Sequence, residues 1–128
     1  MAGGRTLKIL CTDDSRLTRK MIQDVIETLG CEFVGAVDGE ETKRLIEKHH
    51  TDLSLVLLDW NIPGPDGLEI LRWLKASDPY RNIPVIMVTA MGHQGKIDEA
   101  LEAGADDYIT KPFDLDDLAC RIKKHLSR

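Results

Sequence analysis

Apolar residues occur along the chain in two alternating kinds of stretch. Short, nearly continuous apolar runs are typical of strands buried on both faces of a parallel sheet, whereas apolar residues spaced three or four positions apart are typical of amphipathic helices. Strand and helix patterns follow one another five times. Strands are predicted at 7–12, 32–37, 53–59, 84–89 and 106–110, and helices at 15–29, 38–50, 66–78, 93–103 and 114–126.

This strict alternation predicts an α/β fold of the doubly wound (βα)5 type. Strands that are joined through helices run parallel, and right-handed crossovers place helices on both faces of the five-stranded sheet. Of the few topologies that remain, the flavodoxin-like strand order 2-1-3-4-5 is the expected one. We expect one domain over residues 1–128, with a disordered start at 1–5.

Two of the predicted helices differ in how firmly the sequence anchors them. Asp66 precedes a helix and is followed three residues later by Glu69, which is the pattern of a capping box. The helix at 93–103 has a thin apolar face, with only Ile97 and Leu101 flanked by alanines. We therefore expect the helix at 93–103 to shift most readily, because little packing holds it.

Composition and charge exclude several classes of protein. The chain has 128 residues, of which 42% are hydrophobic and 30% charged, so it can bury one core without staples. A net charge of −5 argues against a nucleic-acid partner. No apolar stretch approaches the roughly 18 residues that cross a bilayer, which argues against a membrane partner. We expect a cytoplasmic protein.

The cysteines and histidines show no metal-binding pattern. Because the cysteines are odd in number and widely spaced, they are interpreted as buried thiols of a reducing compartment. The histidines are interpreted as solvated side chains. These residues are Cys11, Cys31 and Cys120, and His49, His50, His93 and His125.

Charged residues stand at the carboxyl ends of three predicted strands. Asp13 and Asp14 follow the first strand, Asp59 ends the third, and Lys111 follows the fifth. In a parallel sheet these ends lie on one edge, where open α/β folds bind their ligands. The order 2-1-3-4-5 makes the first and third strands neighbours. Three carboxylates and one ammonium group are therefore expected to converge on one pocket.

This set of groups suits phosphoryl chemistry that depends on a metal ion. Three close carboxylates repel one another, and Mg²⁺ relieves the repulsion by binding a few carboxylate oxygens together with water and phosphate. A carboxylate such as Asp59 can also act as the nucleophile toward phosphorus. Lys111 and Thr89, which ends the fourth strand, offer an ammonium and a hydroxyl to the phosphoryl oxygens.

Four stretches of the sequence resemble the receiver domains of two-component response regulators. Their order and separations make the resemblance specific, and it covers essentially the whole chain. The stretches are Asp13-Asp14-Ser15-Arg16-Leu17-Thr18-Arg19, Leu57-Leu58-Asp59-Trp60-Asn61-Ile62-Pro63 with Asp66-Gly67, Val88-Thr89-Ala90, and Ala103-Gly104-Ala105-Asp106-Asp107-Tyr108-Ile109-Thr110-Lys111-Pro112-Phe113.

The resemblance implies a phosphoacceptor and its metal site. Asp59 matches the residue that accepts a phosphoryl group from a histidine kinase. Asp13 and Asp14 match the acidic pair that holds Mg²⁺. Asp59 completes the set of carboxylates, and Asn61 matches the residue whose backbone carbonyl completes the metal shell. Trp60, next to Asp59, is expected to be half exposed beside the site.

The resemblance also implies the residues that respond to the phosphoryl group. Thr89 matches the hydroxyl switch residue, and Ala90 matches the small neighbour that leaves the phosphate accessible. Lys111 matches the lysine that pairs with a phosphoryl oxygen, and its bond to Pro112 is expected to be cis. Tyr108 matches the aromatic switch residue that turns inward when Thr89 moves.

We therefore expect a phosphorylation-activated switch and not an enzyme with a separate substrate. The expected partners are a sensor histidine kinase or phosphotransfer protein and an unknown output protein, which would meet a face built from the fourth helix, fifth strand and fifth helix. Leu17 and Phe113 either contact the kinase or pack. A monomer or a weak phosphorylation-dependent dimer is expected. An intermediate phosphate carrier and a receiver excised from a longer regulator remain alternatives.

Two rival classes of protein are disfavoured by particular residues. A flavodoxin-like cofactor carrier would need a phosphate loop rich in Ser, Thr and Gly after the first strand, and this chain has none there. An aspartate-nucleophile phosphatase would carry a second aspartate two residues after the nucleophile. Asn61 occupies that position and removes the acid/base group.

Overall fold

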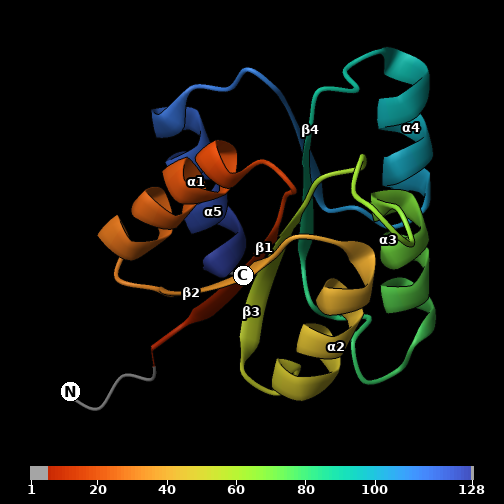
Figure 1. Ribbon diagram of the computed structural model, residues 1–128, viewed down its shortest axis with the longest axis horizontal. Helices are drawn as coiled ribbons and strands as arrows, with labels where there is room; N and C mark the ends of the chain where they lie inside the picture. Colours follow the sequence, from red (N-terminus) through yellow and green to blue (C-terminus); the bar gives the residue numbers. More distant parts are fainter. Residues whose placement is uncertain (1–5, 128) are drawn as a thin grey trace.

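The computed structural model describes residues 6–127, in which strands and helices alternate (Figure 1). The strands form a parallel sheet in the order β2-β1-β3-β4-β5, which confirms the predicted topology. The elements are β1 (Lys8–Thr12), α1 (Arg16–Thr28), β2 (Glu32–Ala36), α2 (Gly39–His49), β3 (Leu53–Leu58), α3 (Gly67–Ala76), β4 (Val85–Thr89), α4 (Gln94–Glu102), β5 (Asp107–Thr110) and α5 (Leu115–Leu126). Residues 1–5, where a disordered start was expected, lie outside the described residues.

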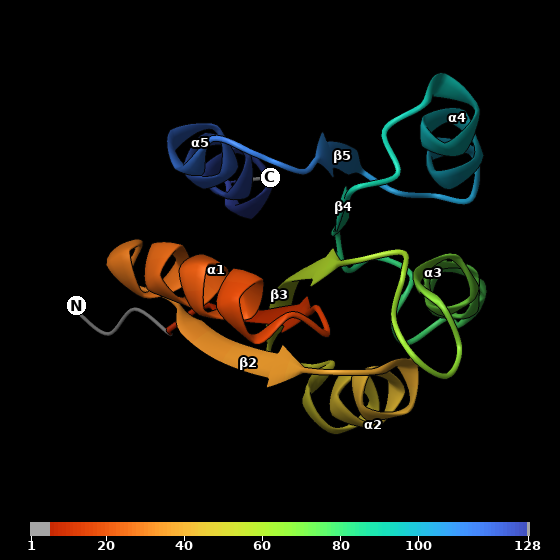
Figure 2. The ribbon, with the colours of Figure 1, turned by 45° about the horizontal axis from the view of Figure 1, so that its top comes forward.

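The sheet separates two hydrophobic cores. Helices α1 and α5 cover one face of the sheet, and α2, α3 and α4 cover the other (Figures 1 and 2). Successive side chains of a strand point to opposite faces. Leu55 and Leu57 of β3 accordingly belong to the α1/α5 core, whereas Val56 and Leu58 belong to the core on the other face. Burial on both faces explains the continuous apolar run that predicted β3.

The backbone hydrogen bonds of the sheet continue past the strand ends at the carboxyl edge. The N–H of Asp59 donates to the carbonyl of Thr12 at 3.1 Å, and the N–H of Lys111 donates to the carbonyl of Thr89 at 2.9 Å. These bonds fix the backbones of two charged residues relative to the ends of β1 and β4. The edge is therefore a rigid platform for the side chains that it carries.

Four of the five helices in the described chain begin with a side-chain cap. The capping residues are Ser15, Asp38, Asp66 and Asp114. At α3 the full capping box predicted from Asp66 is present. His93 takes the corresponding place before α4 and makes no side-chain cap hydrogen bond. None of the helices described over residues 6–127 is long and apolar enough to cross a membrane.

Two sequence expectations about side chains on the helices were wrong. Leu101 of α4, expected on the packing face, is 44% exposed, because Ala100 is the residue that α4 turns toward the core. Cys120 of α5 is exposed, although its thiol was expected to be buried. It stands between Leu118 and Ile122, which both face the sheet, and so points away from it.

Candidate functional site at the carboxyl edge of the sheet

Three carboxylates meet where β1 and β3 end. Asp13, Asp14 and Asp59 each offer an oxygen, and these oxygens lie within 4.8 Å of one another. Asp13 and Asp59 are buried, whereas Asp14 is exposed. The neighbouring strands β1 and β3 bring Asp13 and Asp59 together, and Asp14 lies on the side of the cluster that faces solvent. Oxygen ligands in this arrangement are of the kind that Mg²⁺ binds.

Asp13 is held by the start of α1. Its Oδ1 accepts the N–H of Ser15 at 2.9 Å, and its backbone carbonyl accepts a hydrogen bond from the Arg19 guanidinium at 2.8 Å. Ser15 is also the cap of α1, so the same residue orders the helix and the carboxylate. Burial raises the pKa of the Asp13 carboxyl, and the hydrogen bond from Lys111 only partly opposes this.

The ammonium of Lys111 lies between two of the carboxylates. Its Nζ is 2.6 Å from Oδ2 of Asp13 and 2.7 Å from Oδ2 of Asp59. Burial lowers the pKa of Lys111, but the hydrogen bonds to Asp13 and Asp59 outweigh it, so the pKa is raised. The lysine is therefore charged and neutralises part of the acidic cluster. Its peptide bond to Pro112 is cis, as the resemblance implied.

The other predicted residues lie at or just after the ends of β3 and β4. Asn61 is exposed, and its N–H donates to Oδ1 of Asp59 at 3.2 Å. Thr89 is fully buried at the end of β4, and its Oγ1 accepts the N–H of Met91 at 3.4 Å. Ala90, the next residue along the chain, is exposed, and its methyl group is too small to block access to this edge of the sheet. The structure thus brings together an anionic oxygen, a backbone donor and a short exposed side chain.

Tyr108 is joined to the same loop as Thr89. The Tyr108 ring is buried, and its hydroxyl donates to the carbonyl of Met91, whose N–H already contacts Thr89. Burial raises the pKa of Tyr108, and the nearby charge of Asp59 adds to this. The Tyr108 ring is thus already inward while Thr89 still contacts Met91. The resemblance implied that the ring turns inward when Thr89 moves, but the inward position seen here does not require that movement. Met91 is the residue through which the two predicted switch side chains are connected.

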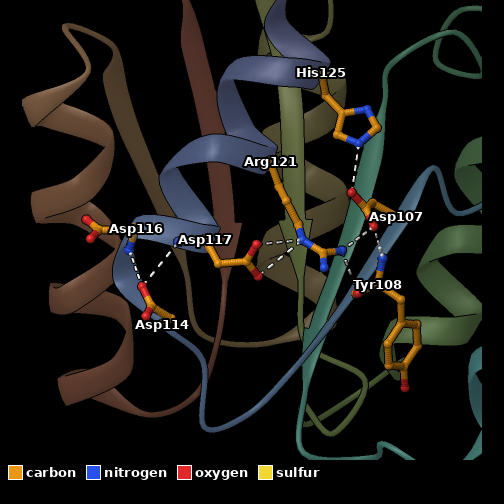
Figure 3. Close-up of polar contacts among 7 residues, drawn as sticks. All are labelled: Asp107, Tyr108, Asp114, Asp116, Asp117, Arg121 and His125. Carbon is orange, nitrogen blue, oxygen red and sulfur yellow. Dashed lines mark hydrogen bonds and ion pairs between the residues drawn. The ribbon is translucent and has the colours of Figure 1, made fainter.

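An ion-pair cluster fastens α5 to β5 beside Tyr108, as Figure 3 shows. Arg121 Nη1 lies 2.7 Å from Oδ1 of Asp107 and donates to the Tyr108 carbonyl at 3.3 Å. His125 Nε2 lies 3.0 Å from Oδ2 of Asp107. Burial raises the pKa of Asp107, but the bonds from His125 and the Tyr108 N–H and the charge of Arg121 bring it below its ordinary value. The backbone of β5 is thus fixed, while the Tyr108 ring points away from the cluster.

This cluster was not predicted from the sequence. His125 was expected to be solvated and is only 5% exposed. Arg121 and His125 are four residues apart on α5, a spacing that places both on one helix face. That spacing, with Asp107 in the preceding strand, is the signal that would have found it.

Trp60 corrects another expectation. It was predicted to be half exposed and is 4% exposed, within the core on the α2/α3/α4 face. Lys96 of α4 covers it, with Nζ 4.9 Å from the centroid of the Trp60 ring. Of the two residues left open as kinase contacts, Leu17 is 73% exposed and Phe113 is partly buried against the α1/α5 core.

Comparison with known proteins agrees with this geometry. Residues 9–123 match the family described as response regulator receiver domain. The chain belongs to this family. It is 41% identical over 120 residues to the phosphate regulon transcriptional regulatory protein PhoB of Pseudomonas aeruginosa, a match that covers 94% of this chain and 52% of PhoB. It is 35% identical over 121 residues to the polar-differentiation response regulator DivK of Brucella ovis, covering 94% of this chain and 97% of DivK.

A solved receiver domain shows the same architecture. The receiver domain of a sensor histidine kinase from Pseudomonas aeruginosa, with a magnesium ion in its active-site cleft, has a TM-score of 0.86 and 27% identity to this chain. The likeness covers 97% of this chain and 100% of that one. The receiver domain described here spans about half the length of PhoB and nearly all of DivK.

Proposed function

We propose that this receiver domain is a phosphorylation-activated switch in which Asp59 accepts a phosphoryl group from a sensor histidine kinase or a phosphotransfer protein. The observation that carries the proposal is the convergence of the Asp13, Asp14 and Asp59 carboxylates, two of which, Asp13 and Asp59, pair with the charged Lys111. A buried structural carboxylate needs one counter-charge. Three carboxylates at one sheet edge, two of them buried, fit a site that holds a cation and a transferable anionic group.

Mg²⁺ fits the donor set of this site. The carboxylates of Asp13, Asp14 and Asp59, whose oxygens lie within 4.8 Å of one another, and the backbone carbonyl of Asn61 are the groups that would hold it. When bound, Mg²⁺ neutralises charge on the carboxylates and on the phosphoryl oxygens. The magnesium in the kinase receiver domain from Pseudomonas aeruginosa supports this assignment.

Each of the site residues then has its own role in phosphoryl transfer. A carboxylate oxygen of Asp59 attacks phosphorus, a P–O bond forms, and the P–N bond of the donor histidine breaks with its electron pair left on the imidazole. The N–H of Asn61, already directed at Asp59, donates to the developing charge. Lys111 and Thr89 bind the phosphoryl oxygens after transfer, and Ala90 leaves the approach open.

The response is transmitted through Met91. Because Thr89 and Tyr108 both hydrogen-bond to the backbone of Met91, a movement of Thr89 toward the phosphoryl group disturbs the loop before α4. The face formed by α4, β5 and α5 then changes its preference for an output protein, either as a monomer or as a weak dimer. A cytoplasmic location is part of the proposal, and the three free cysteines agree with it.

The kinase side of the proposal uses the other face of the site. A hollow of about 370 Å³ opens beside Lys111 and is lined by Thr18, Met21, Pro112 and Phe113, among others. Leu17, 73% exposed, extends the apolar surface along α1. A donor histidine that approaches Asp59 from this side meets an apolar surface that needs a partner.

Acetyl phosphate with Mg²⁺ tests the phosphoacceptor. We expect one phosphoryl group on Asp59, detected by intact mass and by its lability to hydroxylamine, and none in Asp59→Asn because an amide is not a nucleophile toward phosphorus. Asp66→Asn is the matched control, since it changes a carboxylate of the same loop and keeps the cap. A phosphoryl group that persists in Asp59→Asn would overturn the assignment. If phosphorylation changes the amide chemical shifts of the pocket alone, the alternative of an intermediate phosphate carrier would be favoured over the switch.

The metal site is tested through Lys111. Lys111→Ala removes a cation that competes for the same carboxylates, so Mg²⁺ should bind at least as tightly, with a gain of ~2- to 10-fold. Mg²⁺ titration followed by tryptophan emission measures this. Lys48→Ala, which removes a charge from the exposed end of α2, should leave the affinity unchanged. Weaker binding by Lys111→Ala would show that the lysine builds the site and does not compete with the metal.

A further inference from the structure

Trp60 is held in a fixed position next to Asp59. Its carbonyl accepts the N–H of Gly67 at 2.8 Å, at the start of α3. A Cβ on Gly67 would lie 2.2 Å from the Asp59 carbonyl and 2.7 Å from the Trp60 Cα, so the loop is packed against α3 without space between them. The Trp60 ring is buried in the core. Neither the backbone nor the ring of Trp60 is free to follow a moving neighbour.

Lys96, which covers the ring, belongs to the least anchored helix. Helix α4 has nine residues, one of them buried, and no side-chain cap. Lys96 is the third residue of α4, where the helix dipole disfavours a cation, and the first turn contains no acidic residue. The contact with the Trp60 ring, at 4.9 Å from its centroid, compensates for this unfavourable place.

Two weaker contacts extend the same connection. Lys96 Nζ lies 3.7 Å from Glu99, and Glu99 lies 3.7 Å from Arg72 of α3. All three side chains are at least one-third exposed, so these pairs contribute little by themselves. Within residues 6–127, the cation over the buried Trp60 ring is the charged contact that joins the first turn of α4 to the loop that carries Asp59.

The Lys96–Trp60 contact joins the movable helix α4 to the fixed loop after Asp59. Met91, three residues before α4, carries the hydrogen bonds of Thr89 and Tyr108, so a displacement of Thr89 is passed to the first turn of α4. Lys96 moves with that turn, whereas Trp60 stays with Asp59. The distance between them must change when the loop moves.

We propose that the Lys96–Trp60 contact holds α4 in the position seen here and opposes activation, so that Lys96 sets how readily the phosphorylated state is reached. The inference rests on the proposed function, since it assumes that a phosphoryl group on Asp59 displaces Thr89. Lys96 is a positioning residue, because it acts through α4 and contacts no reacting atom. A ligand that favours the displaced state binds more tightly when the opposing contact is removed.

The test uses Mg²⁺ with beryllofluoride, a mimic of the phosphoryl group, in a Trp73→Phe parent in which Trp60 is the only tryptophan. Lys96→Gln should alter the emission of Trp60 before any ligand is added. It should also lower the beryllofluoride concentration for half-maximal amide shift at Ala100 by about two- to fivefold, the range that a cation over a ring allows. Lys96→Arg restores the parent value in both measurements.

A matched control and a double-mutant cycle separate the ring contact from the helix dipole. In the wild type Lys43 of α2 stands over the Trp73 ring at 5.1 Å, and in the parent a phenylalanine ring takes that place, so Lys43→Gln removes a lysine over an aromatic ring outside α4 and should change neither measurement. In a Trp60→Leu background, which has no tryptophan left to follow, the effect of Lys96→Gln on the half-maximal beryllofluoride concentration should disappear. Trp60→Phe, which keeps a ring with a weaker attraction for cations, should reduce the effect and serves if the leucine variant does not fold.

The outcomes distinguish this inference from the proposed function. If beryllofluoride shifts no amide in the parent, the phosphoacceptor proposal is overturned and this inference with it. If the parent responds and Lys96→Gln responds at the same concentration, only the inference is overturned. An effect of Lys96→Gln that persists unchanged in Trp60→Leu assigns the effect to the helix dipole and also overturns it.

Discussion

Helices α3 and α4 lie on the same face of the sheet, yet they are anchored in opposite ways. Helix α3 begins with a capping box at Asp66 and buries five residues, including three leucines and an isoleucine. Helix α4 begins at His93 without a side-chain cap and buries only Ala100. Each fully buried aliphatic side chain contributes ~1.5–3 kcal/mol, so α3 is held by several such contributions that α4 lacks.

This difference assigns different tasks to the two helices. Helix α3 anchors the loop that carries Asp59 and Trp60, so the proposed phosphoacceptor keeps its position. Helix α4 follows the loop that carries Met91, where Thr89 and Tyr108 are connected. Elements that move in regulation have few buried apolar contacts, which is the state of α4. In the proposed switch, a firmly anchored α3 and a weakly anchored α4 on one face would let a fixed site act on a movable surface.

The largest expected effect comes from equal truncations of the two helices. Leu74→Ala in α3 removes a fully buried side chain and should destabilise the domain by ~2–5 kcal/mol. Leu101→Ala in α4 removes a side chain that is 44% exposed and should cost less than ~1 kcal/mol. Urea unfolding of both variants measures the difference. Equal losses would contradict the contrast between the helices.

How far the sequence predicted this contrast depends on the kind of interaction. The capping box at Asp66 and the thin face of α4 were predicted, because both depend on residues near one another in the chain. The burial of Trp60 and the contact with Lys96 were not, since they depend on how α4 meets the loop after β3. Pairs of residues 36 positions apart have no local signature.

The polar groups show the same division. The strand order and the ends of the strands predicted that Asp13, Asp59 and Lys111 would converge, because parallel strands bring their carboxyl ends to one edge. The burial of His125 against Asp107 was missed. Its position on α5 is settled by a carboxylate on β5, and the only trace of that partner in the sequence is the four-residue spacing of Arg121 and His125.

A second prediction asks whether looseness belongs to α4 alone or extends to β5. Asp107→Asn removes the charge that Arg121 and His125 share and should destabilise the domain by ~1–2 kcal/mol at neutral pH. Hydrogen exchange should show no change in the local opening of α4. Faster local opening of α4 in this variant would mean that β5 and α4 form one loose unit.

The pH dependence of Asp107→Asn has a definite sign. The pKa of Asp107 lies below its ordinary value, so its contribution to stability is present above the unfolded pKa of ~3.9 and is lost as the pH falls through the folded pKa. The stability difference between the wild type and Asp107→Asn should therefore be constant near neutral pH and shrink below pH ~4. Arg121→Gln, which removes a partner and keeps the carboxylate, should shift this loss toward higher pH.

A third prediction weakens the firm helix at its start. Asp66→Ala removes the acceptor for the Glu69 N–H and should cost ~1 kcal/mol. Because α3 also anchors the loop after Asp59, local exchange should increase at Trp60 and Asn61 as well as in the first turn of α3. Asp66→Asn keeps the cap and serves as the control. A loss of stability without increased exchange at Trp60 would separate the cap from the loop.

The smallest effect should come from strengthening the loose helix. His93 already has the extended backbone of a capping residue, with φ −80° and ψ 152°, but its side chain makes no cap hydrogen bond. His93→Ser supplies a hydroxyl for an N–H of the first turn and should stabilise the domain by ~0.5 kcal/mol, with His93→Ala as the control without a cap. Serine adds no charge near Lys96, so the contact between Lys96 and the Trp60 ring should be unchanged. Hydrogen exchange in α4 should slow, and α4 should come closer to α3 in its resistance to opening. If exchange in α4 is unchanged although the domain is more stable, the thin packing at Ala100 alone sets its looseness and the missing cap is irrelevant to it.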